Sequence, residues 1–151
     1  MNIKVGKLIK VLRNTKGLTQ NEFAEQLNVS RDLVSKWEQG KSSPDYDTLK
    51  RIGETFNIDP KRLAETDEFI FEQFSACIPY GITPHDAAKL VRVFTNLLTD
   101  SELELYAMRF VECLSTKQIA ERLHYTDGTI RNKLVRIRKN LKAFLAAAKE
   151  E

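Results

Sequence analysis

The sequence predicts an all-α fold, on three observations. Apolar residues recur every three or four positions along most of the chain, the spacing that places them on one face of a helix. Several of these stretches open with a helix-start signal, either Thr followed three residues later by Glu or Thr followed directly by Pro. Gly, Asn and Pro separate the stretches, as expected where one helix ends and the next begins.

Length and composition allow a packed core and argue against a membrane protein. The 151 residues, 42% of them hydrophobic, suffice for one ordinary domain or two small ones. No apolar run approaches the roughly 18 residues that a membrane span needs, and the amino terminus lacks a signal-peptide pattern. We therefore expect a cytoplasmic protein without a membrane partner.

The cysteines and histidines do not indicate a cofactor or metal site. Cys77 and Cys113 are isolated, and His85 and His124 are equally scattered. Metal and redox sites need such residues close together, so we expect neither metal nor cofactor. Both thiols are expected to be buried as small hydrophobic groups.

Charge is distributed unevenly along the chain. The net charge of +3 is made up of +4 over residues 1–63, −3 over 64–98 and +2 over 99–151. Two basic ends therefore flank an acidic middle. A modest positive total is weak support for nucleic-acid binding, because phosphate binding depends on a local patch.

Residues 19–40 predict two short helices joined by a tight turn. A capping box opens the first helix and apolar residues follow on one face, as Thr19, Glu22, Phe23, Ala24 and Leu27. Asn28 falls at the reversal, and Asn tolerates a left-handed backbone. Ser30 is placed to cap a second helix, whose inward residues are Leu33, Val34 and Trp37. The outward face of that helix is polar and can form hydrogen bonds with base edges, which is the architecture of a helix-turn-helix DNA reader.

Three further helices are expected around this pair. Residues 2–15 form an amphipathic helix that Gly17 ends as a left-handed cap. Residues 46–56 form another, after a loop in which Pro44 opens a turn, and a short helix covers about 60–63.

At these positions the chain resembles the lambda-repressor-like DNA-binding family, also called XRE or Cro type, from about residue 5 to residue 60. The matching residues are Arg13, Gly17-Leu18-Thr19-Gln20, Phe23-Ala24, Leu27, Val29-Ser30, Val34-Ser35-Lys36-Trp37-Glu38, Gly40, Pro44, Leu49 and Ile52. The resemblance implies a five-helix bundle that binds double-stranded DNA. Asn28 is a mild departure, because the family often has glycine there.

The resemblance also implies which side chains meet DNA. The positions that face the major groove hold Ser30, Arg31, Asp32, Ser35 and Lys36. The positions of backbone-phosphate contacts hold Gln20, Lys41 and Ser42. Arginine can pair with two acceptors on guanine, and aspartate accepts from cytosine N4. The alternatives are a solvated polar face for the first group and a surface without contacts for the second.

Two further roles follow from the resemblance. Trp37 is expected in the core rather than stacked on a base. Arg13 and Glu38 occupy places where the family has a partly buried ion pair, joining the first helix to the end of the reading helix. Such a pair fixes the helix orientation more than it adds stability, because desolvation offsets much of the attraction.

The middle of the chain predicts two more helices. Residues 64–78 continue as a helix that is apolar around most of its circumference, through Phe69, Ile70, Phe71, Phe74 and Ile78. A helix of this kind is enclosed, and a second copy of the chain is one way to enclose it. Thr83 and Pro84 start a helix to about Leu98, with its inward face formed by Ala87, Leu90, Val91, Phe94 and Leu97.

The carboxy-terminal part predicts a second helix-turn-helix unit. Thr99 and Glu102 start one helix, a pair of helices follows over about 116–145, and the turn between them holds His124 and Tyr125. Thr126 caps the last helix, whose inward residues are Ile130, Leu134, Ile137 and Leu141. Between Arg131 and Lys142 there are six basic residues and no acidic one, which favours a polyanionic partner.

The stretch from Leu98 to Leu141, with Thr99-Asp-Ser-Glu102, Lys117-Gln-Ile119-Ala120 and Ile130-Arg-Asn-Lys-Leu134, resembles region four of sigma factors and LuxR-type output domains. It departs from them at Gly128, which weakens the start of the reading helix. It also departs at His124, where those families commonly have a small residue. The residues that would contact DNA are Arg131, Asn132, Lys133, Arg136 and Arg138. A basic surface without contacts is one alternative, and a module that kept this fold to bind a partner or a second copy is another.

We therefore predict a lambda-repressor-like domain over residues 1–63, a helical connector over 64–97 that is a candidate for dimerisation, and a sigma-region-four-like domain over 98–151. The predicted function is sequence-specific binding of double-stranded DNA, by a homodimeric repressor of phage or mobile-element type. The alternative is a carboxy-terminal domain that binds RNA polymerase or another protein. No arrangement of catalytic residues appears, so the sequence does not predict an enzyme.

Overall fold

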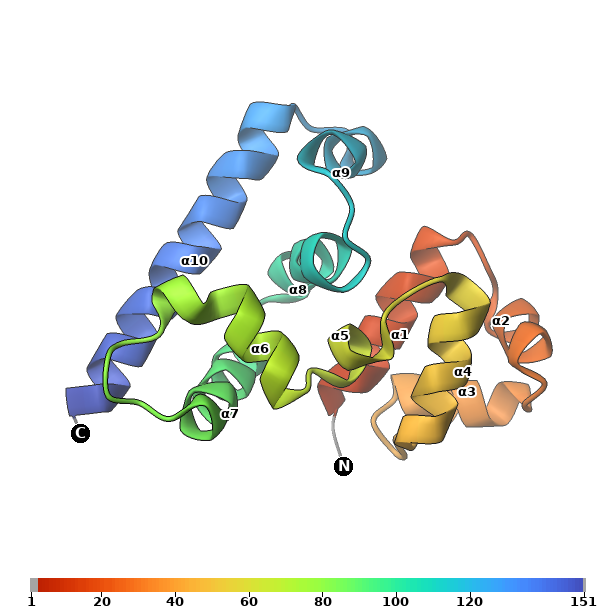
Figure 1. The fold of residues 1–151 in the computed structure, drawn as a ribbon. Helices are drawn as coiled ribbons and strands as arrows, with labels where there is room; N and C mark the ends of the chain where they lie inside the picture. Colours follow the sequence, from red (N-terminus) through yellow and green to blue (C-terminus); the bar gives the residue numbers. More distant parts are fainter. Residues whose placement is uncertain (1–2, 151) are drawn as a thin grey trace. The chain divides into compact units, whose positions relative to one another are not determined.

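The structure is a computed structural model that describes residues 3–150, and the described chain is built from helices without strands (Figure 1). The predicted all-α fold is confirmed. The chain forms two compact units, residues 1–64 and 65–151. The first unit contains α1 (Ile3–Thr15), α2 (Gln20–Leu27), α3 (Arg31–Glu38), α4 (Tyr46–Phe56) and α5 (Pro60–Ala64). The second contains α6 (Asp67–Phe74), the 3-10 turn η1 (Ser75–Cys77), α7 (Pro84–Asn96), α8 (Asp100–Tyr106), the π-helical turn η2 (Ala107–Val111), α9 (Thr116–Leu123) and α10 (Asp127–Glu150).

The first unit packs α3 between α1 and α2 (Figure 1). Its core is apolar, and the rings of Phe23 and Phe56 stack with their centroids 4.9 Å apart. The helices α1 and α3 cross closely at Gly6, where an added Cβ would lie 1.8 Å from the carbonyl oxygen of Trp37. Trp37 itself is buried, as predicted. The first unit therefore fixes α3 by close backbone contact as well as by its apolar side chains.

The helix expected over residues 64–78 is interrupted at its start. Glu65 takes a left-handed conformation with φ of 52°. The Thr66 hydroxyl then accepts a hydrogen bond from the Phe69 N–H at 3.2 Å and caps α6. The expectation of a continuous helix was wrong because a threonine side chain that can satisfy a free backbone N–H favours a new helix start.

The second unit encloses three of the apolar side chains of α6 within the same chain. Phe69, Ile70 and Phe74 are buried, and the Phe74 ring packs against Phe110 and Tyr106 at centroid distances of 5.2 and 6.2 Å. Phe71 of the same helix is 40% exposed, and its cover by a second copy stays a prediction. The segment that was expected to be a connector thus contributes α6 and α7 to the core of the second unit.

The long helix α10 packs against α9 near its start and against α7 toward its carboxy-terminal end (Figure 1). Its inward residues agree with the prediction, since Ile130, Leu134, Ile137 and Leu141 are buried. Among the described residues, no helix combines the length and the apolar composition that crossing a bilayer requires.

Two expected burial positions are wrong. Leu97 is 69% exposed rather than inward, because α7 ends at Asn96 and the chain turns away from the helical path. Cys113 is exposed, in a left-handed conformation with φ of 60° after η2, whereas Cys77 is buried as expected.

Candidate nucleic-acid interface

The turn between α2 and α3 is built by local hydrogen bonds. Thr19 and Glu22 form the predicted capping box at the start of α2. Asn28 ends the helix with φ of 57° and ψ of 44°, the left-handed conformation that asparagine tolerates. The next N–H, of Val29, donates to the carbonyl of Ala24 at 3.0 Å. The Ser30 hydroxyl accepts from the Leu33 N–H at 3.1 Å and starts α3. The turn is therefore held by hydrogen bonds within residues 19–33.

The predicted ion pair between Arg13 and Glu38 is present. The Arg13 Nε and Nη2 atoms donate to the two carboxylate oxygens of Glu38 at 2.8 and 2.9 Å, and Nη1 donates to the Leu18 carbonyl at 2.9 Å. The hydrogen bond with Glu38 raises the pKa of Arg13 above its ordinary value. Only 12% of the Arg13 side chain and 4% of the Glu38 side chain is exposed. This buried bidentate contact ties the end of α3 to α1, so α3 cannot rotate without breaking it.

The outward face of α3 presents the charged side chains expected to read DNA. Arg31, Asp32 and Lys36 are exposed, and within residues 3–150 their side chains form no hydrogen bond or ion pair. Ser35 is half-buried, and its hydroxyl accepts from the Gln39 amide at 2.8 Å. The structure thus leaves two cations and one carboxylate on one face of a fixed helix.

The three residues expected at the phosphate backbone lie at the edges of this face. The Gln20 amide, at the start of α2, donates to Glu38 at 3.3 Å. Lys41 is exposed in the loop that follows α3. The Ser42 hydroxyl is buried without a hydrogen-bond partner among the described residues. The Ser42 N–H donates to the Lys36 carbonyl at 3.4 Å. Lys41 is the side chain of the three that is most open to a phosphate.

The turn between α9 and α10 repeats the first one with different residues. A second capping box, Ser115 with Gln118, starts α9. His124 takes the left-handed conformation with φ of 60° and ψ of 40°, and the Tyr125 N–H donates to the Ala120 carbonyl at 3.0 Å. The departure at His124 is therefore accommodated as an αL residue, in the same role as Asn28. The Ser-x-x-Gln pattern was visible in the sequence but was not used to place this helix start.

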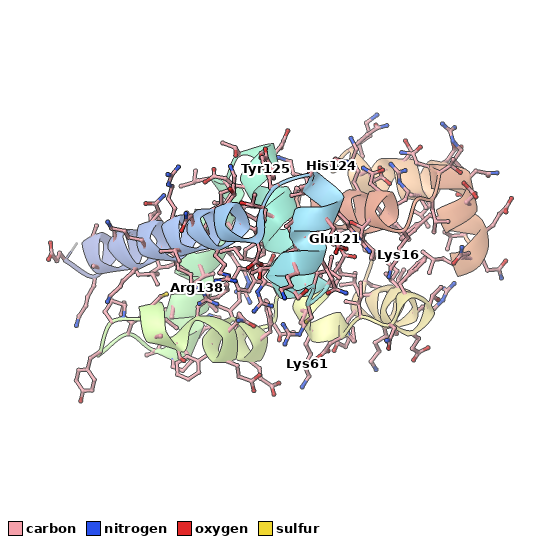
Figure 2. The ribbon with its side chains drawn as sticks, turned by 90° about the horizontal axis from the view of Figure 1, so that it is seen from above. Lys16, Lys61, Glu121, His124, Tyr125 and Arg138 are labelled. Carbon is pink, nitrogen blue, oxygen red and sulfur yellow. The ribbon has the colours of Figure 1, made fainter. Side chains whose placement is uncertain are left out.

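Several basic side chains of the second unit are already engaged. Arg131 forms an ion pair with Asp127, one turn earlier on α10. The Lys133 ammonium lies 5.2 Å from the centroid of the Tyr125 ring. The Arg138 guanidinium lies over the rings of Phe110 and Phe74, at 5.0 and 5.7 Å from their centroids, and is half-buried against α6 (Figure 2).

Asn132 and Arg136 remain exposed on the first turns of α10. The pKa of Asp127 is lowered by a hydrogen bond with Thr116 and by Arg131, so the carboxylate stays charged and keeps hold of Arg131. This pair was not among the predicted contacts, although the i, i+4 spacing of Asp127 and Arg131 is that of a helical ion pair. The five residues expected at DNA thus lie on one helix but in unlike surroundings.

Two protein families match the chain. The helix-turn-helix family matches residues 9–63, and the sigma-70 region 4 family matches residues 92–141. The first match contains α2 and α3, and the second contains α9 and the first half of α10. Both resemblances drawn from the sequence are therefore confirmed.

Individual relatives match parts of the chain, and the first two below are HTH-type transcriptional regulators by name. The HTH-type transcriptional activator BcrR of Enterococcus faecalis is 44% identical over 62 residues, covering 41% of this chain and 30% of BcrR. The HTH-type transcriptional regulator ImmR of Bacillus subtilis is 35% identical over 66 residues, covering 44% of this chain and 52% of ImmR. The ImmF control region 10 kDa protein of Bacillus phage phi105 is 39% identical over 70 residues, covering 46% of this chain and 78% of that protein.

The matches are partial in length. The chain spans 30% and 52% of BcrR and ImmR. No solved structure gives a significant match.

Proposed function

Because the chain belongs to the XRE-type helix-turn-helix family and carries a second unit of the sigma-70 region 4 family, we propose that it regulates transcription by sequence-specific binding of double-stranded DNA through α3. The observation that carries this proposal is the outward face of α3. Arg31, Asp32 and Lys36 project from a helix whose orientation is held by the pair of Arg13 and Glu38. A rigid presentation of this kind is what discrimination between base edges requires.

The side chains on α3 suit the major groove. Arg31 can donate to O6 and N7 of guanine, and Asp32 can accept from N4 of cytosine. Ser30, Ser35 and Lys36 complete the reading face. Gln20, Lys41 and Ser42 would contact the phosphate backbone beside the groove and set the register of the helix on the duplex.

We propose that two copies act together as a repressor. The helix α3 has eight residues and covers few base pairs, so useful specificity needs a second reader on an inverted repeat. Two half-sites about one helical turn apart would place both copies on the same side of the duplex. Occupation of a promoter by such a dimer excludes RNA polymerase. The similarity to the ImmF control region protein of a phage supports a phage or mobile-element origin.

Footprinting on the DNA upstream of the protein's own gene tests this proposal, because regulators of this type often control their own promoter. The footprint identifies the operator, and a binding titration on that operator then gives the affinity. Arg31→Ala should weaken binding about 10- to 100-fold by removing a bidentate base contact, and the loss should fall on specific DNA only. Lys41→Ala should weaken binding to every sequence and lower the salt slope by about 1.

Glu54→Ala, at an exposed position on α4, is the control for a surface change in the same unit. If Arg31→Ala and Glu54→Ala bind the operator equally well, α3 is not the reading helix and the proposal fails.

A second candidate function applies to the carboxy-terminal unit alone, which would bind a protein rather than DNA. The observation that favours it is the engagement of Arg131 by Asp127 and of Arg138 by two aromatic rings. Combined Arg131→Ala and Arg136→Ala substitutions separate the two cases. Lower DNA affinity with a shallower salt slope favours a second DNA reader, and an unchanged affinity and slope favour the protein partner.

A further inference from the structure

We infer that a second copy of this chain docks on the face formed by α7, the start of α8 and α10, which we call the α7–α10 face. It consists of Val93 on α7, Leu97 directly after α7, Glu102 on α8, and Asn140, Ala143 and Phe144 on α10. This inference rests on the proposed function in one respect, which is that two copies act together on DNA. The observations that locate the interface are independent of DNA.

The helix α7 carries a second apolar stripe besides the one that faces the core. Its core-facing residues, among them Ala87, Val91 and Phe94, are buried. Val93 and Leu97 lie one turn apart on another side and are 51% and 69% exposed. Scattered apolar residues are normal on a protein surface, but two large aliphatic side chains in one row on one helix form the start of a patch.

A hollow lies beside this stripe. It has a volume of about 440 Å³ and is lined by Phe94, Leu97, Glu102, Asn140, Ala143 and Phe144, among other residues. The rings of Phe94 and Phe144 pack at a centroid distance of 5.6 Å within it. The same face therefore carries a projecting leucine and an apolar recess next to it.

That combination fits a copy of the same chain. In a two-fold dimer the same patch is used on both subunits, so every projection must meet a recess that the patch itself provides. A rotation of this kind places Leu97 of each subunit at the hollow of the other. An unrelated partner would need only the recess or only the projection.

The polar residues of the face also suit a self-complementary contact. Glu102 lines one side of the hollow from α8, and Lys139 lies on α10 one turn before Ala143 and is exposed. Two-fold pairing can bring the acidic side of one copy opposite the basic side of the other. Asn140 carries both a donor and an acceptor, so it can pair with the same amide across the axis. A nucleic acid would instead be repelled by Glu102 and would leave the apolar residues unused.

The test measures the mass of the full-length chain by sedimentation equilibrium over a range of concentrations. The unchanged protein should form dimers. Leu97→Asp should raise the dimer dissociation constant by about 30-fold or more, because a carboxylate would be buried in an apolar contact. Tyr80→Asp is the control, since Tyr80 is 95% exposed in the loop between η1 and α7, outside the α7–α10 face.

Circular dichroism checks that both variants are folded, which is expected because both positions are exposed. If Leu97→Asp does not fold, Val93→Asp on the same stripe takes its place. A chain that stays monomeric at every concentration overturns the inference, and so does a Leu97→Asp protein that dimerises like the Tyr80→Asp protein, because the interface would then lie elsewhere.

DNA binding distinguishes this inference from the proposed function. The Leu97→Asp monomer should still bind a single half-site with the affinity of an unchanged monomer, and it should lose the cooperative binding to the inverted repeat. Dimers without any DNA binding would sink the proposed function and leave the α7–α10 face standing. Half-site binding by a protein that forms no dimers would contradict the α7–α10 face and leave DNA binding through α3 standing.

Discussion

The two helix-turn-helix motifs share one turn geometry but hold their second helices by different means. In each, an arginine in the preceding helical segment donates to the carbonyl five residues later, from Arg13 to Leu18 and from Arg109 to Leu114. In the first motif Arg13 also binds Glu38 at the end of α3. At the same register of the second motif the chain has Leu134, which is buried.

The difference follows from the length of the second helix. The helix α3 has eight residues and buries only two of them, so an ion pair at its end supplies the anchor. The helix α10 has 24 residues and buries five, spread along its length. Apolar contacts along a long helix make an ion pair unnecessary. The short helix α3 is thus held by an ion pair in addition to its close contact with α1 and its two buried side chains, and the long helix α10 by repeated packing.

The largest change in stability is expected at Gly6, where α1 crosses α3, and Gly128 near the start of α10 is the glycine to compare with it. In Gly6→Ala the new methyl would lie 1.8 Å from the Trp37 carbonyl oxygen, a backbone atom that no side-chain rotation can move away. We expect a loss of about 4 kcal/mol of unfolding free energy, at the top of the range for single substitutions. Gly128→Ala, near the start of α10, has no atom within 4 Å of the new methyl and should gain about 0.5 to 1 kcal/mol through helix propensity.

Denaturant unfolding measures both changes. Trp37, the only tryptophan, reports on the first unit by fluorescence, and circular dichroism reports on the whole chain. If Gly6→Ala leaves the fluorescence transition in place, α1 and α3 do not need their close approach, and the anchor of α3 lies elsewhere.

A second prediction exchanges the anchor of the first motif for that of the second. Glu38→Leu leaves the Arg13 guanidinium largely buried without its carboxylate, and we expect a cost of about 3 kcal/mol. Adding Arg13→Met replaces the buried pair by two apolar side chains and should recover most of that loss. The measurement is again the unfolding transition followed by Trp37 fluorescence.

Operator binding refines this result. If the double variant is stable yet binds the operator weakly, the ion pair serves to orient α3 rather than to stabilise it. If the single and double variants are equally unstable, the pair contributes mainly through its hydrogen bonds to the rest of the first unit.

The comparison also shows what the sequence could and could not predict. The capping boxes at Thr19 and Thr99 and the left-handed asparagine were predicted because each depends on a few residues at close spacing, whereas the pair of Arg13 and Glu38 was predicted from the resemblance to the lambda-repressor-like family. Gly6 was missed, since a crossing of two helices is a tertiary contact that leaves no local pattern. The break at Glu65 was missed because apolar spacing on both sides hid a cap at Thr66.

The candidate contacts on α10 show the same limit. Composition predicted a basic stripe, but it could not tell which cations were already engaged. The contact of Arg138 with Phe74 joins residues far apart in the sequence, and only the fold brings them together.

A third prediction concerns the pair on α10. Asp127→Asn removes the charge that holds Arg131, so the guanidinium becomes available for phosphate. If the second unit binds DNA, affinity for random duplex should rise about 3- to 10-fold and the salt slope should steepen by about 1. Glu121→Gln removes the same charge from an exposed position on α9 and is the control. A rise that is equal in both variants would reflect net charge alone, and no rise in either would favour the protein-binding function.

The smallest effect is expected from acid. Asp67, at the start of α6, has its Oδ2 atom 2.8 Å from His85 Nδ1 and accepts from Arg92 Nη2 at 2.6 Å. The hydrogen bond with His85, followed by that with Arg92, lowers the pKa of this carboxyl below 3.8. Because the pKa is depressed in the folded state, the contribution to stability is present above the unfolded value and is lost as the pH falls through the folded one.

The second unit should therefore weaken as the pH falls below about 4, and Asp67→Asn should make that decline shallower by removing one of the groups responsible. Thermal unfolding by circular dichroism, compared at several pH values, measures the slope. The fluorescence of Trp37 should not respond to the substitution, since the pair lies wholly in the second unit. An acid decline with the same slope in both proteins would mean that other carboxylates dominate, and that Asp67 organises the start of α6 without setting its response to pH.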